Sequence, residues 1–258
     1  MQHANGIAFT VSGPDDAPAI VLSNSLGTTL DMWSPQLDAF ARQYRVVRYD
    51  TRGHGASIAP SGAYTLDELG CDVVAVLDAL DIERAHFCGI SMGGLTGQWL
   101  GVHAGERIGK LILANTAARI GTFEGWSQRS ALVRTQGMDE VADGAAGRWF
   151  TADFASRERA VVAQMTDSLR ATPPNGYAGC CDALATADLR GDIGGIAVPT
   201  LVVAGRFDPV TTVDDARFIA ERIAGARMAT LDASHLSNVE AAQAFSSTVL
   251  TFLAESNG

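Results

Sequence analysis

The sequence predicts one α/β domain, a mostly parallel twisted sheet flanked by helices, with a helical cap inserted between two strands. Apolar runs of strand length alternate with segments that carry apolar residues at helical spacing, which is typical of parallel strands joined by crossover helices. After Thr116 this alternation stops, and several helical stretches follow without a strand-like run. The chain has 258 residues, of which 47% are hydrophobic, so it can bury a large core. We expect a first part of the core at 1–118, the cap at 119–188 and a second part of the core at 189–258.

Each expected element has a signal in the sequence. Ile7 to Val11 alternates weakly before a Gly13-Pro14 turn, which predicts an edge hairpin. The apolar runs that predict parallel strands are 19–23, 45–50, 85–88, 110–115, 199–205 and 226–231. The segments that predict helices of the core are 33–44, 66–80, 95–100, 213–223 and 241–253. Thr65 and Glu68 have the spacing of a capping box, so the second of these helices should begin after Thr65.

Charge and composition argue against several classes of function. The formal net charge is −10 and no run is rich in Lys or Arg, which argues against binding to nucleic acid or to an anionic membrane. No apolar run approaches the roughly 20 residues of a membrane helix. The N-terminus lacks a basic segment followed by an apolar stretch, so we expect a cytoplasmic protein. The spacing of the cysteines fits neither a zinc site nor a disulfide framework, so we expect buried thiols at Cys71, Cys88, Cys180 and Cys181.

The pattern Gly89-Ile90-Ser91-Met92-Gly93 lies between a predicted strand and a predicted helix. A sharp turn in this context exposes the serine hydroxyl, and the flanking glycines let neighbouring backbone approach without a Cβ clash. Ser91 is therefore the candidate nucleophile. The Met92 N–H, at the start of the helix, should be one donor of an oxyanion hole. The Leu26 N–H should be the second, because Gly27 and Thr28 allow the loop after the first parallel strand to bend there.

A serine nucleophile needs a histidine base and an acid that orients the histidine. In the α/β-hydrolase plan these partners follow the serine in the order acid, histidine, each just past a strand. Asp208 and His235 have these positions, and loops at the carboxyl edge of a parallel sheet can converge. Asp232 is the alternative acid, although its place in the loop of His235 suits loop bracing better. The histidines without a strand-end position are His3, His86 and His103.

One further polar turn carries a histidine. The stretch Asp50-Thr51-Arg52-Gly53-His54-Gly55-Ala56-Ser57 follows the second parallel strand. His54 could take part in chemistry, but we interpret Asp50, Arg52 and His54 as residues that hold loops together around the glycines.

Several longer segments carry a resemblance to a known family. They are Leu22-Ser23-Asn24-Ser25-Leu26-Gly27-Thr28-Thr29, the stretch 48–57, His86-Phe87-Cys88-Gly89-Ile90-Ser91-Met92-Gly93-Gly94, and the stretches 114–121, 176–181 and 233–240. With these the chain resembles the α/β-hydrolases throughout, and more narrowly it is similar to the 3-oxoadipate enol-lactone hydrolases of bacterial aromatic degradation. The resemblance implies hydrolysis of that lactone through an acyl-enzyme, in the β-ketoadipate branch, with a small anionic lactone as partner. It implies no metal and no organic cofactor, and it leaves the oligomeric state open.

A lactone that carries a carboxylate needs a cation or hydrogen-bond donors in an acidic protein. The candidates lie in the expected cap or beside the oxyanion loop. For the carboxylate they are Arg119, Arg129 and Arg134, for the pocket wall Trp126 and Trp149, and for a direct substrate contact Ser25.

Other functions share the same three side chains. A carboxylesterase, a carbon–carbon bond hydrolase of ring-cleavage products and a cofactor-free perhydrolase all use this triad, so they stay as alternatives. A haloalkane dehalogenase needs a carboxylate nucleophile where this chain has Ser91. The alternative of a different class is a non-catalytic ligand-binding protein on the same scaffold, since a fold alone does not fix function.

Overall fold

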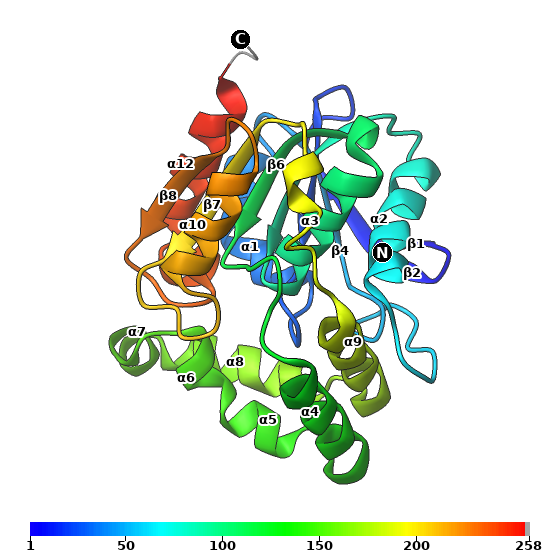
Figure 1. Cartoon of the computed structure of the whole chain (residues 1–258), viewed down its shortest axis with the longest axis vertical. Helices are drawn as coiled ribbons and strands as arrows, with labels where there is room; N and C mark the ends of the chain where they lie inside the picture. Colours follow the sequence, from blue (N-terminus) through cyan, green and yellow to red (C-terminus); the bar gives the residue numbers. More distant parts are fainter. Residues whose placement is uncertain (256–258) are drawn as a thin grey trace.

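The computed structural model describes residues 1–255, which contain one eight-stranded sheet in the order β1-β2-β4-β3-β5-β6-β7-β8 (Figure 1). The strands are β1 Gln2–Ala4, β2 Ile7–Ser12, β3 Ala19–Ser23, β4 Arg45–Tyr49, β5 Ala85–Ile90, β6 Ile108–Ala114, β7 Thr200–Gly205 and β8 Arg227–Leu231. β1 and β2 form an antiparallel hairpin on the edge of the sheet, and the neighbours from β4 to β8 pair in parallel. The predicted fold class is confirmed.

The register aligns the carboxyl ends of the parallel strands. Ser23 lies opposite Gly89, Ile90 lies opposite Ala114, and Ala114 lies opposite Val203. β3 is buried at all its positions because helices cover both faces of the sheet. The loops that leave β3, β5, β6 and β7 therefore begin side by side at one edge.

Helices cover both faces of the sheet (Figure 1). α1 (Ser34–Phe40) packs against α12 (Ala242–Ala254) on one face. On the other, α3 (Met92–His103) packs against α2 (Leu66–Ala79), and α10 (Val213–Arg222) packs on β7. The shorter helices of the core are η1 Leu30–Trp33, η2 Gly105–Arg107, η3 Ile193–Gly195 and α11 Ser237–Glu240.

The starts and ends of these helices follow from their sequence. α2 begins after Thr65 with the expected capping box, in which Glu68 N–H donates to the Thr65 hydroxyl. The first helix was expected to reach Tyr44, but it ends at Phe40, and the N–H groups of Gln43 and Tyr44 then bond to the Phe40 carbonyl in a tight turn. α3 is longer than the expected 95–100, because it begins immediately after Ser91.

Six α-helices lie between β6 and β7 and gather at the carboxyl edge of the sheet (Figure 1). They are α4 Phe123–Gln136, α5 Asp139–Asp143, α6 Ala145–Trp149, α7 Ala152–Arg157, α8 Arg159–Arg170 and α9 Pro174–Thr186. α4 packs along α9, and Gly137, with φ of +83°, ends α4. We propose the cap at the predicted bounds 119–188. The last three residues of the predicted segment 189–258 lie outside the described residues.

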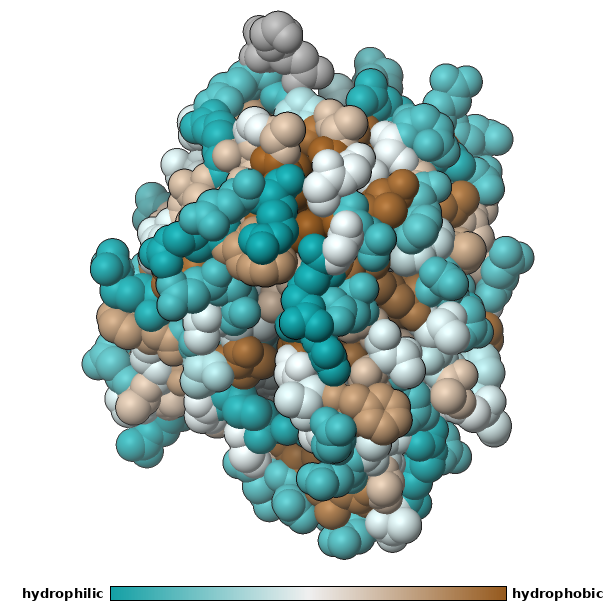
Figure 2. Space-filling view, in the orientation of Figure 1, coloured by the Kyte–Doolittle hydropathy of each residue, from teal (hydrophilic) through white to brown (hydrophobic). Residues whose placement is uncertain are grey.

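The surface is mostly hydrophilic on the face that Figure 2 shows, with apolar side chains scattered over it. Such scatter is ordinary on protein surfaces. Across residues 1–255, none of the helices has both the length and the apolar character needed to span a bilayer.

Candidate active site

Ser91 lies at a sharp turn between β5 and α3. Its backbone has φ of +58° and ψ of −117°, a strained conformation for a residue with a Cβ. A Cβ on Gly89 would lie 2.1 Å from the Gly93 carbonyl oxygen, and a Cβ on Gly93 would lie 2.4 Å from that of Ser23. The glycines of the motif are therefore required by close backbone packing, as the sequence predicts.

Asp208 and His235 come from neighbouring loops after β7 and β8. The Nδ1 atom of His235 lies 2.8 Å from Oδ2 of Asp208, and both side chains are buried. Because a carboxylate accepts hydrogen bonds, Nδ1 carries the proton and Nε2 is left as an acceptor. This is the protonation pattern that a general base needs.

The Asp208 carboxylate has further hydrogen-bond donors. Oδ1 accepts from the N–H groups of Val210, at 2.8 Å, and Thr211, at 3.0 Å. Oδ2 accepts from the Thr211 hydroxyl and from the Asn115 amide. Burial raises the pKa of Asp208, but the hydrogen bond and charge of His235, with these donors, lower it more, so the net pKa lies below its ordinary value. The carboxylate is held ionised against His235.

Asn115 joins the acid loop to the histidine loop. It follows β6 with φ of +43°, and its amide nitrogen lies 3.1 Å from both Asp208 Oδ2 and the Ser234 carbonyl oxygen. Its amide oxygen accepts from the Ser237 hydroxyl at 2.5 Å. A single buried side chain thus fixes the separation of the two loops.

Ser91 and His235 line one cavity under the cap. The lining residues are Ser25, Leu26, Ser91, Ile120, Trp126, Arg129, Arg148, Trp149, Leu169, Tyr177, Val210 and His235. Within residues 1–255 no hydrogen bond joins the Ser91 hydroxyl to the His235 ring. Such bonds are often long before substrate binds.

A tight turn after β3 forms another part of the cavity wall. The Thr28 N–H bonds to the Ser25 carbonyl, and Gly27 has φ of +82°, the value required at the third position of a type II turn. The Gly93 N–H bonds to the Asn24 carbonyl at 3.0 Å, which ties this turn to the start of α3. Among the described residues neither the Leu26 N–H nor the Met92 N–H has an acceptor. Both are available to a bound oxyanion.

The family model described as alpha/beta hydrolase fold matches residues 18–242. The chain belongs to the α/β-hydrolase fold family.

Within this family, the chain is similar to several enol-lactonases. This hydrolase is 50% identical to 3-oxoadipate enol-lactonase 2 of Acinetobacter baylyi, over 93% of the chain and 90% of that protein. It is 46% identical to 3-oxoadipate enol-lactonase 1 of the same organism, over 93% and 90%. The crystal structure of the enol-lactonase from Burkholderia xenovorans LB400 matches with a TM-score of 0.96 and 50% identity over 98% of each chain. The family resemblance that the sequence predicts is confirmed.

The structure separates the predicted pocket residues of the hydrolase into two groups. Ser25, Trp126 and Trp149 line the cavity with Ser91. Arg119 and Arg134 are not among its lining residues. Arg134 lies 2.6 Å from Asp182, which neutralises its guanidinium group, and Arg119 lies 3.5 Å from Asp188, a carboxylate that it shares with Arg190.

Two other arginines face the cavity. Arg129 and Arg148 line it, and in residues 1–255 neither is within ion-pair distance of a carboxylate. Arg129 stacks over the Trp126 ring, 5.0 Å from its centroid, and Arg148 donates to the Val141 carbonyl at 2.6 Å. Burial lowers the pKa of Arg148, and the nearby charge of Arg129 lowers it further. The hydrolase therefore keeps two uncompensated positive charges beside Ser91.

Sequence reasoning missed Arg148 and Asn115. Arg148 lies near the end of a helix of five residues, too short for a periodicity that would assign it a face. Asn115 does have a signal, since it follows a parallel strand at the edge where Asp208 and His235 meet.

Proposed function

We propose that this protein hydrolyses 3-oxoadipate enol-lactone to 3-oxoadipate with Ser91, Asp208 and His235 as a catalytic triad. The observation that carries the proposal is one cavity lined by Ser91, His235 and two arginines without carboxylate partners among the described residues. Adipate has two carboxyl groups; in the enol-lactone one is the ring ester and the other is a free anion. The cavity offers a nucleophile for the first and positive charge for the second, and relatives at 50% and 46% identity bear the name of this activity.

In the first step Ser91 opens the lactone. His235 Nε2 takes the proton of the Ser91 hydroxyl as Oγ bonds to the ring carbonyl carbon, and Asp208 stabilises the imidazolium. The negative oxygen of the tetrahedral intermediate accepts from the N–H groups of Leu26 and Met92. The ring C–O bond then breaks, and the departing enolate oxygen takes the proton from His235. An enolate leaves more readily than a simple alkoxide because its negative charge is delocalised, and the enol then relaxes to the ketone.

In the second step water releases the acyl group. His235 accepts a proton from water, whose oxygen attacks the Ser91 ester carbon, and the same N–H pair holds the oxyanion. Collapse returns the proton to Ser91 Oγ and frees 3-oxoadipate. Every proton moves between His235, Ser91, water and substrate, so the proposal includes no metal and no organic cofactor.

In this proposal Arg129 and Arg148 bind the free carboxylate of the lactone. A guanidinium group recognises a carboxylate by two parallel hydrogen bonds. A neighbouring cavity shares Ile120, Trp126, Arg129, Arg148 and Val210 with the first and extends to Pro209. The arginines thus line both cavities, which favours entry of an anion. The proposed partner is a small anionic lactone in the cytoplasm, with no nucleic acid or membrane.

The proposal is tested by loss of the ultraviolet absorbance of the enol-lactone, with Ser91→Ala and a series of neutral p-nitrophenyl esters alongside. Fast lactone loss that Ser91→Ala abolishes, well above ester cleavage, is expected. Ester cleavage without lactone loss would keep the triad and favour a carboxylesterase. No turnover of either compound, together with no labelling of Ser91 by an organophosphonate, would favour a non-catalytic binding protein.

A further inference from the structure

We propose that His54 is a positioning residue that holds the oxyanion turn, Ser25 to Thr28, in its working conformation. The inference rests on the proposed function, in which the Leu26 N–H stabilises the oxyanion. His54 is buried, with 1% of its surface exposed, and it is absent from the cavity lining. It therefore acts through the turn and does not touch substrate.

The ring of His54 bridges two backbone groups of opposite kind. The Gly27 N–H donates to Nε2 at 3.0 Å, and Nδ1 lies 3.2 Å from the Arg52 carbonyl oxygen. A carbonyl only accepts and an amide N–H only donates, so Nδ1 carries the proton and Nε2 is an acceptor. Only a neutral imidazole in this tautomer satisfies both partners. Burial, which lowers the pKa of His54 to about 4, keeps the ring neutral near pH 7.

The bond to His54 fixes the central peptide of the turn. In a type II turn the peptide between the second and third residues, here Leu26 and Gly27, is rotated by roughly half a turn relative to type I. The Gly27 N–H belongs to that peptide, so its bond to His54 favours one of the two orientations. The Leu26 N–H is one residue away, and a shift of the turn would move it from the oxyanion position.

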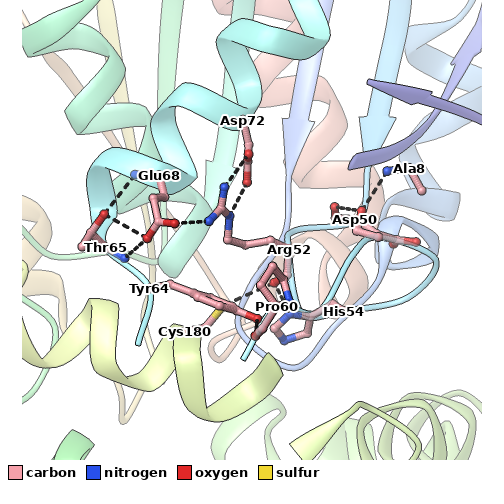
Figure 3. A network of polar contacts seen from close by, with 11 residues as sticks. Ala8, Asp50, Arg52, His54, Pro60, Tyr64, Thr65, Glu68, Asp72 and Cys180 are labelled. Atoms are coloured by element: carbon pink, nitrogen blue, oxygen red, sulfur yellow. Dashed lines mark hydrogen bonds and ion pairs between the residues drawn. The ribbon is translucent and has the colours of Figure 1, made fainter. Parts of the chain in front are cut away.

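His54 is itself held rigidly from α2. Figure 3 shows the Arg52 guanidinium between the carboxylates of Glu68 and Asp72, with His54 on the same loop. Both Asp72 oxygens accept from Arg52, at 2.7 and 2.8 Å. The Cys180 thiol of α9 bonds to the same Arg52 carbonyl that His54 uses. The loop that carries Arg52 and His54 is therefore bonded to α2 of the core and to α9 of the cap, and it holds His54 in place against the turn.

The other side of the turn is closed by the cap. A Cβ on Gly27 would lie 2.5 Å from a methyl carbon of Leu169 and 3.2 Å from the Tyr177 ring. The Tyr177 ring also packs on His54, with centroids 6.2 Å apart. The cap supplies packing, and among residues 1–255 His54 supplies the one hydrogen bond to the central peptide, so His54 decides the orientation of that peptide.

A matched pair of variants tests this role. In His54→Gln the side-chain oxygen reaches the place of Nε2 and can accept from Gly27, whereas in His54→Asn the amide reaches only the place of Nδ1. We expect His54→Asn to lower kcat for the lactone and for p-nitrophenyl acetate by about 10- to 100-fold, part of the cost of losing one oxyanion donor. KM should change less than about twofold, and the inhibition constant of phenylboronic acid, whose serine adduct places an oxygen in the oxyanion site, should rise in parallel. His54→Gln should keep most of the wild-type kcat and most of the affinity for phenylboronic acid.

The outcomes separate the inference from the proposed function. If the wild type turns over neither substrate, the proposed function fails before the variants are compared. If the wild type is active and both variants have equal kcat, the inference is overturned. It is also overturned if His54→Asn loses kcat and melting temperature while boronate affinity stays unchanged, since that is a structural role. If His54→Asn does not fold, His54→Leu replaces it. If neither variant folds while His54→Gln is fully active, His54 has a structural role and the inference is overturned.

Discussion

The two walls of the cavity are built differently. On the sheet side, Ser91 is fixed by its backbone, and His235 is held from behind by Asp208, which accepts from three other residues. On the cap side, Arg129 and Arg148 have few fixed partners and no carboxylate within reach among residues 1–255. In the proposed function, the sheet wall is preorganised for reaction, and the arginines of the cap wall are available to bind an anionic ligand. Loss of a sheet-wall residue should affect every substrate, and loss of a cap-wall arginine should affect only anionic ones.

The largest expected effect is at Ser91. Ser91→Ala removes the proposed nucleophile, so kcat for lactone and neutral esters should fall by about 10⁶-fold. The measurement is steady-state turnover of both compounds, with Ser156→Ala, an exposed serine of α7, as the control expected to behave as wild type. Retention of more than about a hundredth of the activity would show that another group attacks.

The next effect is at Asp208. Asp208→Asn should lower kcat by about 10⁴-fold, because an amide can donate to His235 and favour the wrong tautomer. Asp232→Asn is the matched control, since Asp232 pairs at the surface with Arg206 at 2.6 Å and should be dispensable. The two kcat values decide which aspartate orients His235. Equal losses would reinstate Asp232 as the alternative.

These two predictions concern residues that the sequence could locate. A parallel sheet places the loops after its strands at one edge, so Ser91, Asp208 and His235 are predictable from order and strand ends alone. The cap wall is different, because an arginine on a short helix faces a cavity or a carboxylate according to tertiary packing. Arg134 and Arg129 lie on the same helix, yet Asp182, distant in sequence, neutralises Arg134 alone. That pairing has no local signal.

A third prediction concerns His54, behind the sheet wall. Its pKa is lowered by burial from 6.5 to about 4, so between these pH values the unfolded chain binds a proton that the folded chain does not. This stability is present above pH 6.5 and is lost as pH falls toward 4, by about 3 kcal/mol in the free energy of unfolding. The pKa of His86 is also lowered to about 4, chiefly by burial, so His86 adds to the same dependence of stability on pH. Urea unfolding at several pH values should show a shallower decline for His54→Gln, and an unchanged slope would contradict neutral burial of His54.

The smallest and most selective effect is at the cap wall. Arg129→Met and Arg148→Met should each lower kcat/KM for the lactone by about 30-fold, the worth of about 2 kcal/mol in a charge-assisted hydrogen bond. Methionine keeps the length and apolar packing of the arginine stem, so the change tests charge. Turnover of p-nitrophenyl acetate, which has no carboxylate, should change less than about threefold.

The control for this prediction lies on the same helix. Arg134→Met removes an arginine of α4 that Asp182 already neutralises. Arg119→Met is a second control, because Arg119 lies near Asp188 and does not line the cavity. Both should leave kcat/KM for the lactone within about twofold of wild type, since an exposed ion pair contributes little. If Arg134→Met impaired the lactone as much as Arg129→Met, net positive charge of the cap would be the cause. If all four variants were neutral, the carboxylate would be bound by the sheet wall, and the division between a reactive wall and a recognising wall would not hold.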